Sequence, residues 1–222
     1  MNNKKLSALV LALASTTSFA GTMGPVASPE LLLFLEAGAS YSHAFYKSNA
    51  LLPESITAVT PSGFAINLNN FYPESFWGGY IGASLFFPKY WMLNARYDMF
   101  SREDKINRVA QTEISLAPTK LSFTADKVFG DINALSFGVG GGAVVESLND
   151  GAAIIALSST NPPSESIQGR TIMDPLVEAF AMYRFGNLGV KLNAAYQIPV
   201  HTRFGNGDVN VNLGVNYAFS VL

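Results

Sequence analysis

Two histidines stand out chemically in this 222-residue chain, which contains no cysteine and therefore no thiol nucleophile, disulfide or thiolate metal site. His43 is preceded by Ser40 and Ser42, and His201 is followed by Asp208. A serine, a histidine and a carboxylate that meet in space can catalyse acyl hydrolysis or transfer. No local motif of such enzymes surrounds either histidine, so the competing interpretation is that both are solvated loop residues.

Two further segments carry patterns that are typical of binding loops. Residues 138–143, GVGGGA, satisfy the G-x-G-x-x-A pattern of dinucleotide sites, but no helix start follows them, as that fold requires. Residues 206–212 are rich in Asn and Asp, as a cation-binding loop would be, although a turn before a strand explains them more simply. We therefore predict no cofactor and no metal site.

The composition argues against nucleic acid as a partner and against an ordinary soluble surface. Lys and Arg number 14 and Asp and Glu 16, so the chain has no basic excess. Hydrophobic residues make up 49% of the chain and charged residues only 14%, whereas soluble domains are about 25% charged. The elements that position the candidate residues must therefore keep a large apolar surface away from water.

The N-terminus predicts export. Lys4 and Lys5 precede an apolar run over residues 6–14, and Ser18-Phe19-Ala20 forms a small-x-small cleavage site before Gly21. This is the pattern of a cleaved signal peptide over residues 1–20, and a short membrane anchor is the alternative. Residues 21–30 would then be an N-terminal periplasmic segment. After residue 20 no apolar run is long enough for a transmembrane helix.

Strict two-residue alternation dominates the remainder. In residues 209–221 apolar side chains alternate with Asn, Gly, Ala and Ser, which predicts one long strand with an apolar and a polar face. Similar patterns predict eight strands: 31–42, 76–87, 91–100, 119–129, 132–146, 174–185, 188–198 and 209–221. The 119–129 pattern is the weakest, and residues 106–117 could belong to the same strand.

The connections between these strands alternate in length. Three are tight, around 88–90, 130–131 and 186–187, and four are long, at about 43–75, 101–118, 147–173 and 199–208. In an up-and-down arrangement all short turns lie at one end. This predicts an all-β, eight-stranded antiparallel transmembrane barrel with short periplasmic turns and long extracellular loops.

Charge positions predict which face points inward. Seven charged residues share the phase of the small and polar side chains: Glu36, Arg96, Asp98, Asp126, Glu178, Arg184 and Lys191. A Lys or Arg in mid-membrane costs about 2–4 kcal/mol, so this phase must line the lumen. Buried charges need partners. We expect a lumen charge network in which Arg96, Arg184 and Lys191 pair with Glu36, Asp98 and Glu178.

The opposite phase is expected to face lipid. It carries aromatic residues near strand ends, as in the girdles of membrane barrels: Trp77, Trp91, Tyr183, Tyr196, Tyr217 and Phe219. The alternative is a soluble, lipocalin-like barrel whose apolar face points inward around a ligand. Its outer surface would then be Asn, Gly, Ser and Ala, with few charges.

Residues 31–222 resemble the small eight-stranded outer-membrane proteins, the OmpA-transmembrane-domain and OmpX-like barrels. Phe219 is similar to that family's terminal aromatic residue, and Tyr217, Val215 and Leu213 repeat its alternation, although Ser220, Val221 and Leu222 follow. The resemblance implies that the barrel-assembly machinery reads this strand. The segment GTMGPV, residues 21–26, also resembles a gamma-proteobacterial surface-antigen group.

These patterns lead us to expect an outer-membrane protein without enzymatic activity. It would be held by outer-membrane lipid and lipopolysaccharide, and its extracellular loops would contact a host, matrix or envelope component. Residues 50–76 and 152–173 would supply that contact, or else serve as variable covering. A narrow channel or carrier for small hydrophobic molecules is one alternative. A lipid A acyl hydrolase or transferase using His43 or His201 is another.

Overall fold

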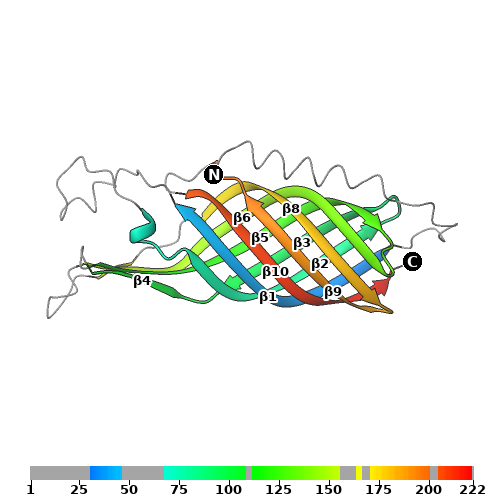
Figure 1. Cartoon of the computed structure of the whole chain (residues 1–222), viewed down its shortest axis with the longest axis horizontal. Helices are drawn as coiled ribbons and strands as arrows, with labels where there is room; N and C mark the ends of the chain where they lie inside the picture. Colours follow the sequence, from blue (N-terminus) through cyan, green and yellow to red (C-terminus); the bar gives the residue numbers. More distant parts are fainter. Residues whose placement is uncertain are drawn as a thin grey trace.

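The computed structural model describes residues 31–46, 68–108, 112–155, 164–166, 171–200 and 205–221. These form ten strands and one short 3-10 helix (Figure 1). The elements are β1 (Leu32–Tyr46), η3 (Leu68–Asn70), β2 (Ser75–Phe87), β3 (Trp91–Phe100), β4 (Glu103–Asn107), β5 (Thr112–Gly130), β6 (Leu135–Ile155), β7 (Ser164–Ser166), β8 (Thr171–Phe185), β9 (Leu188–Gln197) and β10 (Gly205–Ser220).

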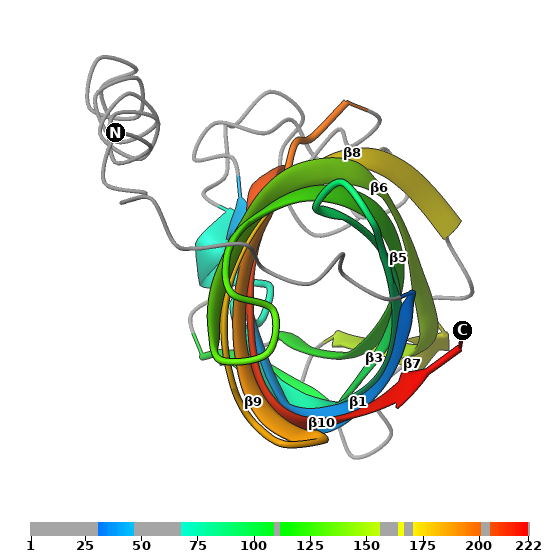
Figure 2. The same cartoon turned by 90° about the vertical axis from the view of Figure 1, so that its right-hand side faces the viewer.

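Eight of these strands close into an antiparallel barrel. The order of neighbours is β5-β3-β2-β1-β10-β9-β8-β6, and pairing of β5 with β6 completes the ring. Figure 2 looks along the barrel and shows this closed ring. Because the first and last barrel strands, β1 and β10, pair from Leu32 with Ser220 onward, no edge remains unpaired. The predicted eight-stranded up-and-down barrel is confirmed.

Three short turns lie at one end of the barrel. Residues 88–90, 131–134 and 186–187 join β2 to β3, β5 to β6 and β8 to β9. Gly186 has a positive φ of 70°, as tight hairpin turns require. The turn predicted at 130–131 is longer than expected, because Asp131 N–H bonds to Leu135 O and Ala134 N–H to Asp131 O, so β6 begins at Leu135.

Two strands extend beyond the barrel at the opposite end. β5 is a single strand from Thr112, so residues 112–117 do belong to it, and β6 continues to Ile155, through residues predicted as loop. β4 pairs with the extension of β5 and β7 with that of β6 (Figure 1). The register shifts between Ala117 and Pro118, where proline has no N–H to donate to the ladder.

The apolar face of the strands points outward. Along β10, Leu213 and Val215 are 55% and 59% exposed, whereas Asn212 and Asn216 are 0% and 2% exposed. The lipocalin-like alternative is therefore wrong for this chain, because it requires the reverse orientation. Within the described residues, no helix is both long and apolar enough to cross a membrane.

The outward face forms an apolar belt of membrane thickness. Along β2 it runs from Trp77 through Ile81 and Leu85 to Phe87. Ten residues of strand at a rise of about 3.3 Å each, tilted by about 45°, span roughly 23 Å. The apolar band of known membrane barrels is about 25 Å tall. The dimensions of the barrel therefore match a bilayer.

Candidate functional site

Arg96 is the centre of the polar lumen. Its Nε lies 3.3 Å from Asp98 Oδ2, its Nη1 lies 3.2 Å from Glu178 Oε2, and Nη1 also donates to Asn193 Oδ1 at 3.1 Å. Ser40 and Asn212 donate to Asp98 in turn. All of these side chains lie on the inward faces of their strands and are buried. Charges taken out of water are thus paired and hydrogen-bonded, as burial requires.

A second ion pair joins β9 and β1, the two strands on either side of β10. Lys191 Nζ lies 2.8 Å from Glu36 Oε1 and donates to Ser84 Oγ at 3.4 Å and Asn94 Oδ1 at 3.3 Å. Ser84 also donates to Glu36. Gly214 stands between Lys191 and Gly38 in the sheet, and a Cβ there would collide with the Ala37 carbonyl and Tyr80 Oη. Because Gly214 has no side chain, the Lys191 and Glu36 side chains can meet over the inner surface of β10.

Arg184 lies away from both ion pairs, at the end of the barrel with the short turns. Its Nη1 donates to Ile132 O at 2.9 Å and Asn133 Oδ1 at 3.1 Å, and its Nη2 to Gly186 O at 3.0 Å. The guanidinium also stacks 5.3 Å from the centre of the Phe34 ring. The expected pairing of Arg184 with Glu36, Asp98 or Glu178 is therefore wrong, because its guanidinium is hydrogen-bonded by two main-chain carbonyls and the Asn133 amide oxygen instead.

The lumen at this end is apolar, which sequence reasoning missed. Phe34, Phe86 and Met92 are at most 1% exposed, and they pack with Phe180 and Ile132 in one cluster. Ile132 belongs to the 131–134 turn, which reaches back into the barrel mouth. The available signal was that Phe34, Phe86 and Met92, all close to predicted short turns or to the strand end beside them, place bulky apolar side chains in the otherwise polar phase. This apolar plug closes the barrel at its short-turn end.

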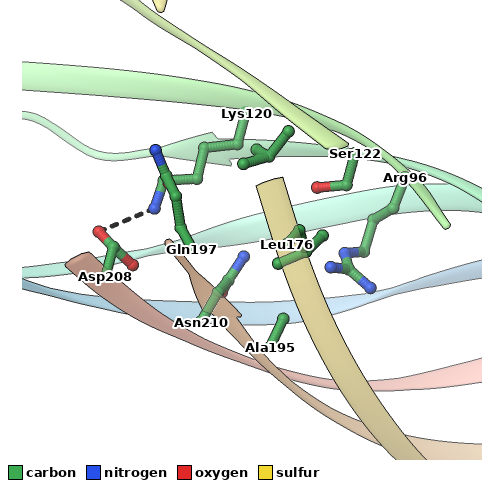
Figure 3. A pocket seen from close by; sticks show the side chains of 9 residues that line it. Arg96, Lys120, Ser122, Leu176, Ala195, Gln197, Asp208 and Asn210 are labelled. Carbon is green, nitrogen blue, oxygen red and sulfur yellow. Dashed lines mark ion pairs between the residues drawn. The ribbon is translucent and has the colours of Figure 1, made fainter. Parts of the chain in front are cut away.

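The lumen towards the opposite end contains another charge cluster. Lys120 Nζ lies 2.8 Å from Asp208 Oδ2 and 3.0 Å from Ser42 Oγ, which itself donates to Asp208. Figure 3 shows Lys120 and Asp208 directed at each other in this ion pair, and both side chains line a small cavity. Its volume of about 10 Å³ is close to the minimum that admits one water molecule. Lys120 was not among the residues predicted for the lumen network.

Aromatic residues cover this cluster on the outer side. Phe76, Phe100, Ile114 and Leu116 form a buried cluster with Tyr72 packed against it. Tyr46 Oη donates to Pro73 O at 2.9 Å. Burial raises the pKa of Tyr46 far above its usual value, and the carboxylates of Glu146 and Asp208 raise it further. Burial also raises the pKa of Tyr72. The outer mouth is therefore packed rather than open among the described residues.

The serine–histidine–carboxylate arrangement is not assembled in the described residues. Ser40 and Ser42 point into the lumen, where Ser42 donates to Asp208 at 2.6 Å. His43 is on the opposite face of β1, where its Nδ1 lies 3.1 Å from Ser75 Oγ and its ring packs 4.9 Å from Phe45. His201 lies outside the described residues. No group of three metal-ligating side chains occurs in the part of the chain that the structure describes.

The glycine-rich segment 138–143 is part of β6, an antiparallel strand that no helix follows. A Cβ at Gly138 would enter the Phe180 ring, and one at Gly140 would meet Asp126. The glycines therefore make room for side chains that fill the lumen. Residues 206–212, where a turn before a strand was preferred to a cation loop, form the start of β10, with Gly207 at a φ of 109°.

The predicted girdle residues lie on the outward face. Five are exposed: Trp77, Trp91, Tyr183, Tyr217 and Phe219. Tyr196 is half-buried and donates to Asn206 O at 2.9 Å. Trp91 and Tyr217 lie near the short turns and Trp77 near the opposite end of β2, so the aromatic side chains mark both edges of the apolar belt.

Solved structures of outer-membrane barrels share this architecture. The crystal structure of Ail, the attachment invasion locus protein of Yersinia pestis, matches with a TM-score of 0.52 and 16% identity, covering 86% of this chain and all of that one. The outer-membrane protein OprG from Pseudomonas aeruginosa matches with a TM-score of 0.57 and 10% identity, over 86% and 97% of the two chains. The chain has the fold of the small eight-stranded outer-membrane barrels. No protein-family model matches its sequence, and no curated protein does so either.

Proposed function

We propose that the protein is an integral outer-membrane barrel that acts through its extracellular surface. Residues 1–20 direct export, residues 21–30 stay in the periplasm, and the barrel-assembly machinery reads β10 through Tyr217 and Phe219. Outer-membrane lipid and lipopolysaccharide surround the apolar belt. The support for this location is the outward apolar face bounded by aromatic residues at both edges, together with the fold shared with outer-membrane barrels.

The closed lumen is the observation that carries the surface role. The apolar plug around Phe34 fills the short-turn end, and the Arg96 and Lys191 ion pairs fill the middle. A cavity of about 10 Å³ leaves room for about one water molecule. A barrel that conducts little through its centre can still bind a partner at its extracellular end. Binding residues are often found on segments that a rigid scaffold presents.

The extension of β5 and β6 is the surface we propose for partner contact. With β4 and β7 it continues the sheet past the barrel, and β4 carries the 55% exposed Ile106. Lys105 of β4 is half-exposed, with its Nζ 3.9 Å from Glu74 Oε1. The structure of Ail in complex with the heparin analogue sucrose octasulfate shows a small barrel of this fold with a sulfated ligand. We infer that a host or matrix component, such as a sulfated polysaccharide, contacts this chain.

Cell fractionation and a binding assay test the proposal. We expect an outer-membrane band whose mobility on SDS gels changes on boiling, as folded barrels resist SDS. Cells that expose the protein should bind immobilised heparin, and Lys105→Glu should weaken that binding. Asn187→Glu, in the exposed 186–187 turn at the other end of the barrel, is the control and should leave it unchanged. A soluble, SDS-sensitive protein would contradict the membrane location, and equal heparin binding by cells lacking the protein would contradict the surface role.

Two measurements address the alternative functions. We expect no steady current in planar bilayers, and a current that Arg96→Ala changes would instead support a channel. We expect an unchanged lipid A mass spectrum on expression. A mass shift that His43→Ala or His201→Ala abolishes would instead support an acyl hydrolase or transferase.

A further inference from the structure

Lys127 is an exception on the outward face of the barrel. It occupies the lipid-facing phase of β5, in line with Leu121, Phe123 and Phe129, which are 36%, 53% and 38% exposed. Among the described residues, it is the only charged side chain on the outward faces of the eight barrel strands across the apolar belt. A lysine among lipid chains is costly unless its ammonium reaches the interface.

The ammonium of Lys127 is directed to the short-turn edge of the belt. Its Nζ donates to Lys89 O at 2.8 Å, and it lies 5.4 Å from the centre of the Trp91 ring. Trp91 is the cross-strand partner of Lys127. Lys89 is exposed in the 88–90 turn that this hydrogen bond secures. The Lys127 ammonium, an interfacial indole and a turn that carries a second, exposed lysine therefore lie together where the belt meets the periplasmic headgroups.

These cations lack an anionic partner in the protein. Neither Lys89 nor Lys127 forms an ion pair among the residues that the structure describes. The ammonium of Lys127 has three N–H donors, and one of them is used by Lys89 O. The remaining donors lie at the depth of phospholipid phosphates, where an anionic headgroup can accept them.

We propose that Lys127, Lys89 and Trp91 bind the phosphate of an anionic phospholipid, such as phosphatidylglycerol, in the inner leaflet of the outer membrane. The proposal rests on the membrane location proposed above and specifies one lipid partner of the barrel. An anionic lipid fits better than a zwitterionic one, because two lysines would repel a choline or ethanolamine group. The acyl chains would lie along the apolar surface of Leu93 and Phe123, which are 49% and 53% exposed on the membrane side of Lys127.

Tryptophan quenching tests the site, because the chain has two tryptophans, at opposite edges of the belt. The chain without its predicted signal peptide is refolded into vesicles that mix phosphatidylcholine and phosphatidylglycerol. In one series the phosphatidylglycerol is brominated, and in a second series the phosphatidylcholine is. Trp77→Phe reports Trp91 alone, and Trp91→Phe reports Trp77 alone. For Trp91 we expect phosphatidylglycerol to be favoured by about fivefold per lysine. For Trp77 we expect no preference.

Three substitutions complete the design. In the Trp77→Phe background, Lys127→Gln and Lys89→Gln should each reduce the preference at Trp91 about fivefold, whereas Lys105→Gln, in β4, should not change it. Added glycerol phosphate should not compete, because the site takes a lipid rather than a free phosphate. The site would be overturned if the preference for phosphatidylglycerol at Trp91 persisted in both lysine variants, or if the Trp77→Phe protein showed no preference. In either case both tryptophans would still be quenched. No quenching of either tryptophan would instead overturn the membrane location and the site with it.

Discussion

Arg96 on β3 and Glu178 on β8 form an ion pair across the barrel, with Nη1 3.2 Å from Oε2. Their strands are not neighbours, since β5 and β6 separate them in the sheet. The two side chains are 7% and 1% exposed, so the attraction between them acts where water cannot screen it. The pair therefore joins opposite walls of the lumen, while main-chain ladders join only adjacent strands.

Glu178→Ala should destabilise the barrel by about 3 kcal/mol, because it leaves the Arg96 guanidinium buried with less compensation. This is the lower end of the range for a broken buried pair, since Asp98 remains at 3.3 Å. Urea unfolding in lipid vesicles, followed by tryptophan fluorescence, measures the change. The double variant Arg96→Met/Glu178→Met should cost less than the sum of its two single variants, because both members of the pair are removed together, although Asp98 then loses its ion-pair partner. A double variant as unstable as the sum of its single variants would contradict the coupling.

Gly142→Ala should prevent or severely impair folding, because a Cβ there would collide with the main-chain carbonyl of Phe123 on the neighbouring strand. A backbone atom cannot move aside as a side chain can, and β5 and β6 must approach closely for the barrel to close. Gly79→Ala is the control, since its Cβ would meet only Gly38 O at 3.4 Å. The change in gel mobility on boiling reports folding. Equal folding yields of the two variants would show that β5 and β6 can separate without loss.

The strand phases were predictable because side chains alternate strictly between faces in any strand. The same parity places His43 on the face opposite Ser42, although neighbourhood in sequence alone suggested a shared site. Position along the barrel axis was not predictable. Arg184 shares the phase of Glu178, yet six residues of strand place it roughly 20 Å further along, and its height relative to other strands depends on tilt and stagger.

The apolar plug and the extension of β6 were missed, and the extension of β5 was only an open alternative, for different physical reasons. Phe34, Phe86 and Met92 lie in the polar phase, and only the closed barrel shows that they meet at one end. The extension of β5 and β6 lies outside the apolar belt, where no lipid imposes an alternating pattern. In the extension, β5 and β6 pair with each other and with β4 and β7. No alternating pattern in the sequence indicates β4 or β7.

Stability should fall as the pH rises above about 10, with Tyr46 and Tyr72 as two of the causes. Burial raises the pKa of each phenol in the folded state, so the unfolded chain releases these protons first. The unfolded state then binds fewer protons, and the free energy of unfolding decreases with pH. Tyr46→Phe/Tyr72→Phe should flatten this decrease between about pH 9 and 11. Urea midpoints measured across that interval test it, and an unchanged slope would contradict the prediction.

Leu213→Arg should cost about 2–4 kcal/mol if the outward face meets lipid, because Leu213 lies near the middle of the belt. The side chain is 55% exposed, and the same change at so exposed a position of a water-soluble protein would typically cost no more than about 0.5 kcal/mol. Val221→Arg is the matched control, since Val221 is 48% exposed but lies beyond Phe219 at the edge of the belt, where the cost is about 0–1 kcal/mol. Urea unfolding in vesicles compares the two. Equal costs at the two positions would mean that the apolar belt does not face a bilayer.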